Sequence, residues 1–195
     1  MTVWWRSLGW ALLLSVLLAG FQACSGLPRI VVLHDPLTPA EHVTLGTAYE
    51  GQGRTDLAAQ EYHAALRQEH GYAPALVGLG NLAFAGGALE EAEPYYRQAL
   101  ATAPENPGAN NNLAMLYLAR GESLDEAERL ARQALAQRGQ LRPYVLDTLA
   151  HIYVLQGRYK EAKAVLEEAE AVAPSENRVL HGRLVQLREQ LAGVY

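Results

Sequence analysis

The chain is built on an internal repeat with a period close to 34 residues. One leucine and one glycine position recur with spacings of 34, 34 and 36 residues: Leu45, Leu79, Leu113 and Leu149; Gly53, Gly87, Gly121 and Gly157. Two alanine positions recur with spacings of 34, 35 and 35 residues: Ala58, Ala92, Ala127 and Ala162; Ala65, Ala99, Ala134 and Ala169. A fixed period of this length in a chain rich in Ala and Leu is typical of stacked helix pairs.

Each recurring residue type has a physical role in a helix pair. Two helices cross closely only where side chains are small, so we expect one small residue per repeat at the crossing, opposite the alanines of the second helix: Gly46, Gly80, Ala114 and Ala150. The recurring glycines are expected to end the first helix of each pair with a positive φ. Capping boxes are predicted at Thr38 to Glu41 and at Ser123 to Glu126, and Asn106-Pro107 is expected to start the third pair.

This pattern resembles the tetratricopeptide repeat (TPR), which has Leu-Gly or Leu-Ala early in its first helix, then a tyrosine, a turn glycine and two alanines in its second helix. The matching segments are Leu45-Gly46…Tyr49, Leu79-Gly80…Ala83, Leu113-Ala114…Tyr117 and Leu149-Ala150…Tyr153. Tyr62 and Tyr96 occupy the large position of the second helix, which holds Ala131 and Leu166 in the later copies. The resemblance implies an all-α, right-handed superhelical solenoid of four repeats: 39–72, 73–106, 107–142 and 143–176.

Residues 177–195 are predicted to form a capping helix and tail. Their leucines follow one another at spacings of four, three and four residues, which places them on one helical stripe: Leu180, Leu184, Leu187 and Leu191. Such a helix would cover the exposed core of the last repeat.

The N-terminal segment is predicted to be a targeting signal rather than part of the folded domain. Arg6 precedes the short apolar run from Leu8 to Ala19, so residues 1–23 are expected to be a signal peptide of the lipoprotein type. Cys24, the only cysteine, follows in Phe21-Gln22-Ala23-Cys24, which resembles a bacterial lipobox and implies lipidation. Cleavage by the ordinary signal peptidase after Ser25 is the alternative.

Residues 24–38 would then be the lipidated N-terminus and a tether. Ser25 after the cysteine implies, by the same resemblance, an outer-membrane lipoprotein that faces the periplasm. Within the tether, the β-branched stretch 30–33 is compatible either with extended chain or with an edge strand that adds to a partner's sheet.

Composition argues against several other classes of function. The net charge is −5 and Lys160 and Lys163 are the only lysines, which disfavours nucleic acid as a partner. Six histidines without ligand spacing and a lone cysteine nominate no metal site, and no cofactor is expected. Gly78-Leu79-Gly80 imitates a dinucleotide fingerprint but lies within a predicted helix. The Glu90–Glu93 and Glu167–Glu170 runs are expected on solvated surface, and no residue set suggests an enzyme.

The family resemblance implies a partner-binding groove on the inner face of the first helix of each repeat. Carried over position by position, that face comprises Val77, Asn81 and Phe84; Asn111, Asn112, Met115 and Leu118; and Tyr144, Asp147, Thr148 and His151. Asparagine amides both donate and accept hydrogen bonds and suit a peptide backbone. None of these positions is basic, which disfavours recognition of a C-terminal carboxylate.

The sequence therefore predicts a membrane-anchored TPR scaffold or adaptor that binds a protein or peptide partner in its concave groove. The alternative is an accessory subunit of an envelope machine, either in pilus or secretion assembly or in a cysteine-peptidase-associated system. The latter rests on a loose resemblance to TPR segments that accompany bacterial papain-like cysteine peptidases.

Overall fold

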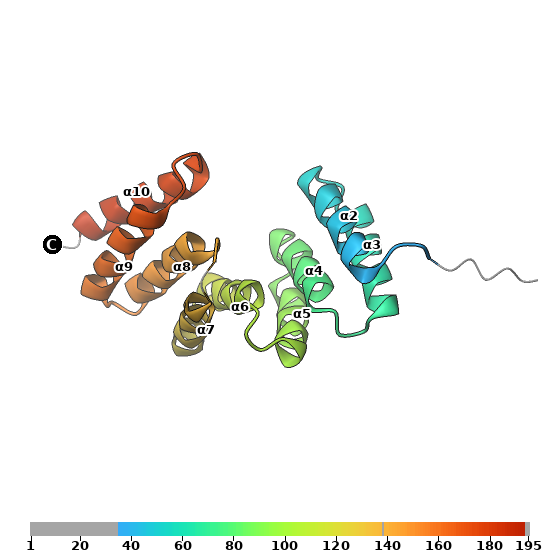
Figure 1. Cartoon of the computed structure of the whole chain (residues 1–195). Coiled ribbons are helices and arrows are strands. Elements are labelled where there is room, and N and C mark those ends of the chain that lie inside the picture. The colour runs from blue at the N-terminus through green and yellow to red at the C-terminus, as the bar shows by residue number, and fades with distance from the viewer. Residues whose placement is uncertain (1–34, 138, 194–195) are drawn as a thin grey trace, which may run out of the picture. The chain divides into compact units, whose positions relative to one another are not determined.

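The structure is a computed structural model that describes residues 35–137 and 139–193, and in this part of the chain it is all-α. Within these described residues nine helices follow one another: α2 (Pro39–Gly51), α3 (Thr55–Gln68), α4 (Ala73–Ala85), α5 (Leu89–Thr102), α6 (Pro107–Arg120), α7 (Leu124–Ala136), α8 (Arg142–Leu155), α9 (Tyr159–Val172) and α10 (Arg178–Ala192) (Figure 1). They all belong to one unit, residues 37–195. The predicted all-α repeat solenoid is confirmed.

Several predictions concern the N-terminal segment and lie outside the described residues. These are the signal peptide (1–23), the acylated Cys24 and the stretch 30–33. Among the helices that are described, none combines the length and the apolar character needed to cross a membrane.

The helices are arranged as four pairs and a final single helix. Within each pair the two helices pack along each other: α2 with α3, α4 with α5, α6 with α7, and α8 with α9. The first helices of successive pairs also contact one another, from α2 through α4, α6 and α8 to α10. Within the described residues, successive second helices make no such contact. The first helices therefore form one continuous inner row.

Helix starts follow the local sequence signals at two of the three predicted caps. The Thr38 hydroxyl accepts a hydrogen bond from the Glu41 N–H, and the Thr38 N–H donates to the Glu41 carboxylate at 2.7 Å. The Asn106 side chain accepts from the Ala109 N–H at 2.9 Å, directly before Pro107. The fourth pair starts at Arg142, one residue earlier than the predicted boundary at 143.

The recurring glycines end the first helix of every pair, as predicted. Gly53, Gly87, Gly121 and Gly157 have φ values of 72°, 78°, 65° and 72°. At the first of them, the Gly53 N–H donates to the Glu50 carbonyl and the Arg54 N–H donates to the Tyr49 carbonyl. The same pair of bonds recurs at the other three turns, so each first helix ends in a Schellman motif that satisfies its last carbonyls.

The predicted capping box at Ser123 is wrong. Ser123 precedes α7, but its φ is 51° and its side chain makes no capping hydrogen bond. The third repeat carries one extra residue between Gly121 and Ala127, and the chain accommodates it by a second left-handed residue after the glycine. In that conformation Ser123 does not bring its hydroxyl to the free N–H groups of the helix.

The close crossing within the first two pairs is made against tyrosine rings, which corrects the expectation that alanines lie opposite. A methyl group at Gly46 would come within 2.6 Å of the Tyr62 ring, and one at Gly80 within 2.4 Å of the Tyr96 ring. In the third and fourth pairs, alanine replaces the glycine and a smaller residue replaces the tyrosine: Ala114 with Ala131, and Ala150 with Leu166. A larger residue on the first helix is thus accompanied by a smaller residue on the second helix.

The helix α10 covers the last repeat as predicted. Its four striped leucines are 1–4% exposed, and the helix contacts both α8 and α9. Leu79, Leu113 and Leu149 of the repeats are likewise buried in the core.

Candidate partner-binding groove

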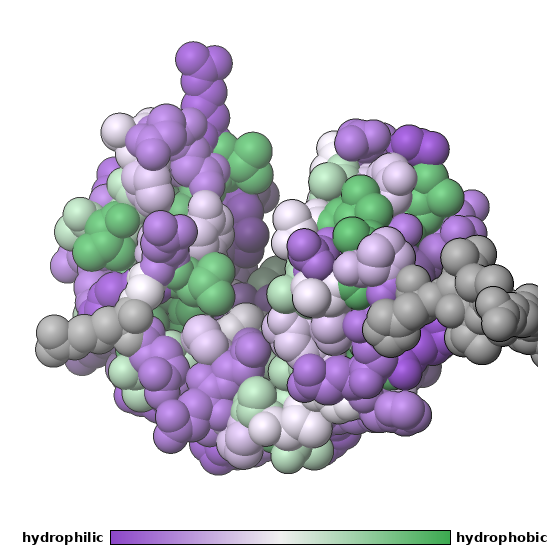
Figure 2. All heavy atoms as spheres, turned by 45° about the vertical axis from the view of Figure 1, so that its right-hand side comes forward, coloured by the Kyte–Doolittle hydropathy of each residue, from purple (hydrophilic) through white to green (hydrophobic). Residues whose placement is uncertain are grey.

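The inner row of first helices encloses two adjacent hollows in the N-terminal half of the repeats. The larger, of about 750 Å³, lies over α2 and α4 and reaches the start of α6; the smaller, of about 280 Å³, lies between α4 and α6. Both are lined by Glu50 and Asn81, and we refer to the two together as the inner groove. Figure 2 shows how deeply the surface is hollowed on one face of the molecule.

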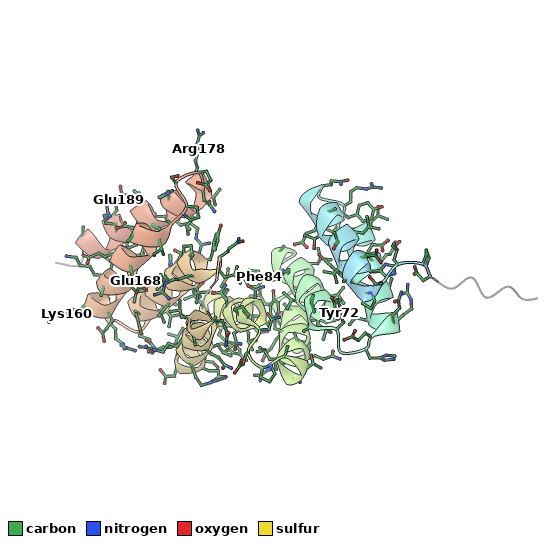
Figure 3. The ribbon with its side chains drawn as sticks, in the orientation of Figure 1. Tyr72, Phe84, Lys160, Glu168, Arg178 and Glu189 are labelled. Atoms are coloured by element: carbon green, nitrogen blue, oxygen red, sulfur yellow. The ribbon has the colours of Figure 1, made fainter. Side chains whose placement is uncertain are left out.

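The lining of the inner groove combines apolar walls with a few polar groups. The larger hollow contributes Thr47, Tyr62, Val77, Gly78, Asn106 and Leu141, and the smaller contributes Phe84, Tyr96, Asn112 and Met115. Phe84, labelled in Figure 3, reaches from α4 towards α6. Five of the predicted groove residues therefore line this one surface: Val77, Asn81, Phe84, Asn112 and Met115.

Hydrogen bonds fix how the Asn81 amide is presented to the groove. Its Oδ1 accepts one bond from the Tyr96 hydroxyl at 3.0 Å and a second from the Asn112 Nδ2 at 2.7 Å. Both acceptor positions of that oxygen are then used. Among the described residues, nothing accepts from the Asn81 Nδ2, so its two N–H groups remain available to a ligand.

Glu50 was missed by the sequence analysis, although the repeat could have located it. The groove positions were assigned only from the second repeat onward, and shifting Asn81 and Phe84 back by 34 residues gives Thr47 and Glu50. The Glu50 carboxylate accepts a hydrogen bond from the Tyr62 hydroxyl at 2.8 Å. Burial, together with this carboxylate, raises the pKa of Tyr62 to about 12, so the phenol stays a neutral donor at physiological pH.

Three of the predicted groove residues lie below the surface, which corrects their expected exposure. Asn111, Thr148 and Asp147 are 6%, 1% and 0% exposed. They are covered because neighbouring first helices, and α10 beside α8, pack over this part of the inner row. Their predicted contact with a partner would require those helices to move.

Asp147 is a buried carboxylate in an ionic cluster. Arg183 of α10 forms an ion pair with Asp147 Oδ2, and His151 Nδ1 lies 3.4 Å from Asp147 Oδ1. Neither carboxylate oxygen receives a well-aligned hydrogen bond. Burial raises the pKa of the Asp147 carboxyl, and the charges of Arg183 and His151 offset part of that rise.

The remaining predicted residues are placed apart from the inner groove. Tyr144 lines a neighbouring pocket between the α7–α8 loop and the α9–α10 loop, which shares Leu141 with the larger hollow. The Tyr144 hydroxyl accepts from Asn177 Nδ2 at 2.6 Å. The His151 Nδ1 lies 2.9 Å from its own helix's Asp147 carbonyl oxygen. Leu118 is half-buried and packs against the core. The structure thus does not join all eleven residues into one binding surface.

One member of the first acidic run, Glu93, is held in an ionic network, which corrects its reading as solvated surface, whereas Glu90 and Glu91 are exposed as expected. Glu93 of α5 accepts from Arg97, from the Tyr117 hydroxyl and from Arg120 of the next repeat, the last at 2.7 Å. The Arg97 bond has the largest effect and lowers the pKa of Glu93. Burial opposes it, and the Arg120 and Tyr117 bonds lower the pKa further.

The same arrangement recurs one repeat later around Glu128. This carboxylate of α7 accepts from Arg132, from the Tyr153 hydroxyl and from Arg158, the last at 2.6 Å. Each network joins the second helix of one repeat to the first helix of the next, and therefore ties neighbouring repeats together.

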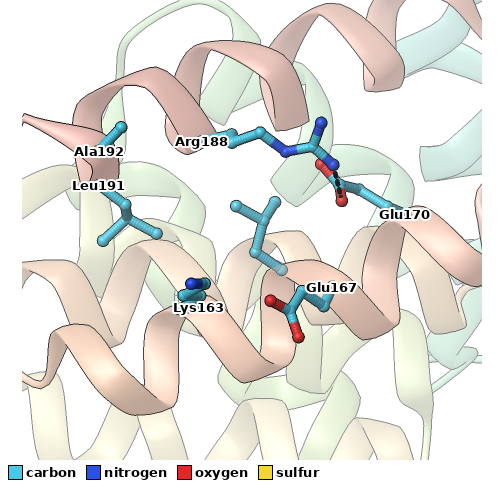
Figure 4. A pocket seen from close by; sticks show the side chains of 7 residues that line it. Lys163, Glu167, Glu170, Arg188, Leu191 and Ala192 are labelled. Atoms are coloured by element: carbon cyan, nitrogen blue, oxygen red, sulfur yellow. Dashed lines mark hydrogen bonds and ion pairs between the residues drawn. The ribbon is translucent and has the colours of Figure 1, made fainter.

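A further pocket, of about 270 Å³, lies between α9 and α10. Leu166 and Leu191 form its floor, and Lys163, Glu167 and the ion-paired Glu170 and Arg188 surround it (Figure 4). The Glu170–Arg188 pair likewise corrects this expectation for Glu170, whereas Glu167 and Glu168 of the second acidic run are exposed as expected. Within the described residues, no group of three or more His, Cys, Asp or Glu side chains is placed to hold a metal ion.

Paired helices of this length, with turn glycines and small residues at their crossings, define a helical-repeat protein with an inner face for contacts. Family models described as tetratricopeptide repeat match residues 43–107, 83–140 and 144–176. Together the matches extend over residues 43–176, and the chain belongs to the tetratricopeptide-repeat family.

One curated relative is human protein O-mannosyl-transferase TMTC1, which is 30% identical over 153 residues. The aligned region is 76% of this chain and 17% of that protein. The chain therefore spans less than a fifth of the relative's length.

The fold is also similar to solved structures. The structure of pilF from Pseudomonas aeruginosa has a TM-score of 0.66 at 22% identity, covering 82% of this chain and 70% of that chain. Cut9–Hcn1 of the APC/C has a TM-score of 0.67 at 19% identity, covering 80% and 30%. MamA has a TM-score of 0.57 at 17% identity, covering 80% and 81%. At these identities the likeness shows the fold.

Proposed function

We propose that this protein is a non-catalytic scaffold or adaptor that holds an extended segment of a partner protein in the inner groove. The observation that carries the proposal is the pair of asparagine amides between apolar walls. Asn81 offers two unused N–H donors, and Phe84 and Met115 lie beside it in the same hollow. Amides of this kind hold a peptide backbone, while apolar pockets supply most of the binding energy.

The polar groups of the inner groove support binding rather than chemistry. They are the amides of Asn81, Asn106 and Asn112, the hydroxyls of Thr47, Tyr62 and Tyr96, and the single carboxylate of Glu50. General acid–base catalysis uses titratable groups that converge on one reacting atom. The Tyr62 and Tyr96 hydroxyls instead donate hydrogen bonds to Glu50 and Asn81.

We further propose that the scaffold is a lipoprotein of the bacterial cell envelope, anchored through Cys24 in the outer membrane and facing the periplasm. The support is the sequence of residues 1–25 alone. Several acyl chains anchor a protein stably, whereas one chain binds only marginally. Mass spectrometry of the N-terminal fragment should show an acylated Cys24, and Cys24→Ala should move the protein out of the membrane fraction. A membrane-bound variant without acyl groups would contradict this anchor.

Site-specific photo-crosslinking in intact cells tests the groove. A photoreactive amino acid at position 84 lies in the inner groove, and one at position 160 lies on α9, far from it (Figure 3). We expect the same partner to be crosslinked from position 84 and from position 115, but not from position 160. A partner crosslinked only from position 160 would place the interaction on the outer surface.

A further inference from the structure

The inner groove carries one acidic side chain, and no basic side chain lines the groove beside it. Glu50 is the single Asp, Glu, Lys, Arg or His among the residues that line the two hollows. Within the described part of the chain it forms no ion pair, whereas Glu93, Glu128 and Asp147 are each paired with arginine. An exposed acid on a solvated surface needs no counter-ion, but Glu50 is half-buried between apolar walls.

The contacts of Glu50 leave part of its carboxylate free. The Tyr62 hydroxyl donates to Oε2, and this bond also holds the side chain across the groove. Because Oε1 has no hydrogen-bond partner among the described residues, it can accept from a ligand. A carboxylate oriented in this way and partly shielded from water favours a cationic group over a neutral one.

From this arrangement we infer that the inner groove selects a peptide segment that carries Lys or Arg beside an apolar residue. The cationic group would pair with Glu50, and the neighbouring side chain would enter the hollow formed by Phe84 and Met115. Asn81 lines both hollows, so its free N–H groups can donate to the carbonyl between those two residues. This inference rests on the proposed function, which it extends from peptide binding to the kind of peptide bound.

The first experiment is a selection of random peptides displayed on phage against the purified full-length chain in mild detergent. We expect Lys or Arg to be enriched at one fixed position, next to an apolar position. Glu50→Gln keeps the acceptor for Tyr62 and removes the charge, and it should lose the cationic enrichment. Glu91→Gln is the matched control, because it removes the same charge from an exposed position of α5 outside the groove.

The second experiment measures how much the charge of the peptide contributes to its affinity, with one selected peptide and fluorescence polarisation. Replacing its Lys by norleucine, or its Arg by citrulline, should weaken binding to the parental protein by about tenfold or more, as for a charge-assisted hydrogen bond. The same replacement should change binding to Glu50→Gln by less than about twofold, since the partner charge is already absent.

The outcomes separate this inference from the proposed function. Peptides that bind without any Lys or Arg preference, but lose binding in Phe84→Ala/Asn112→Ala, would overturn the inference and keep the groove. Selected peptides that still bind Phe84→Ala/Asn112→Ala at full affinity would overturn both.

Discussion

Gly80 lies directly against the ring of Tyr96, so that a methyl group at position 80 would come within 2.4 Å of the ring's Cε1 atom. The fourth repeat solves the same crossing with Ala150 and Leu166, in which a larger residue on the first helix faces a smaller one on the second. Between these two repeats, a larger residue on the first helix is thus matched by a smaller one on the second. This relationship gives a prediction in which two damaging changes compensate each other.

Gly80→Ala should destabilise the protein by about 1–3 kcal/mol, the usual cost of overpacking a tight core. Tyr96→Leu should also destabilise it, because it removes ring contacts and the hydrogen bond to Asn81. The double variant, which recreates the Ala150–Leu166 pair, should be more stable than the sum of the two single changes predicts. Urea denaturation of all four proteins measures this coupling, and strictly additive effects would contradict the crossing.

Replacing Ser123 should affect stability differently from replacing a serine that caps a helix. Its side chain caps nothing and its φ is 51°, so Ser123→Ala should change the free energy of unfolding by less than ~0.5 kcal/mol, where a real cap would cost ~1 kcal/mol. Ser123→Gly should be stabilising by about 0.5–1 kcal/mol, since glycine adopts a positive φ without strain. A clear loss of stability in Ser123→Ala would restore the capping box.

Glu93 should stabilise the protein in a pH-dependent way. Its pKa is lowered in the folded state, first by the Arg97 hydrogen bond, so its contribution is present above the ordinary glutamate pKa and is lost as pH falls through the folded value. At about pH 7.5, Glu93→Gln should lower the melting temperature by about 2–4 °C, which is ~1 kcal/mol for a domain of this size. The deficit should shrink at about pH 3.5. Glu91→Gln should show neither effect, and a deficit that grows in acid would be inconsistent with the network.

The contribution of Asp147 to stability should change with pH in the opposite direction to that of Glu93. Burial raises the pKa of this carboxyl, so the folded state binds its proton more tightly than the unfolded state does. Its ionisation therefore costs stability as pH rises from the ordinary aspartate pKa through the folded value. Thermal melts should show that the melting temperature of Asp147→Asn, relative to the parental protein, is more favourable at about pH 7.5 than at about pH 3.5. The reverse order would mean that Arg183 more than compensates for burial.

The sequence predicted the elements of the fold well because the repeat encodes them locally. Turn glycines such as Gly53 set where helices end, and the leucine stripe of α10 determines which side it buries. The prediction at Ser123 failed because capping depends on backbone conformation, and one inserted residue changed it. The Tyr62 and Tyr96 contacts were missed because the composition of each helix shows what is small but not what lies opposite.

The binding surface was predicted less completely, for reasons of tertiary packing. Position-by-position transfer located Asn81, Phe84 and Asn112 because they occupy inner-face positions of the first helix in their own repeats. The transfer could not show that α10 covers Asp147, because α10 lies outside the repeats and has no equivalent in them. The Glu93 and Glu128 networks connect residues 24 to 30 positions apart on different helices, and periodicity within one helix does not reveal such pairs.

The central claim is that a partner segment lies in the inner groove. Its most direct test is the dissociation constant of the crosslinked partner, measured by isothermal titration calorimetry for the parental protein, for Phe84→Ala/Asn112→Ala and for the outer-surface control Lys160→Ala. We predict that the groove variant binds about 100-fold more weakly, in keeping with the loss of two central contacts, and that the control is unchanged. Equal affinities for the parental protein and the groove variant, with helical content preserved in both, would contradict the account.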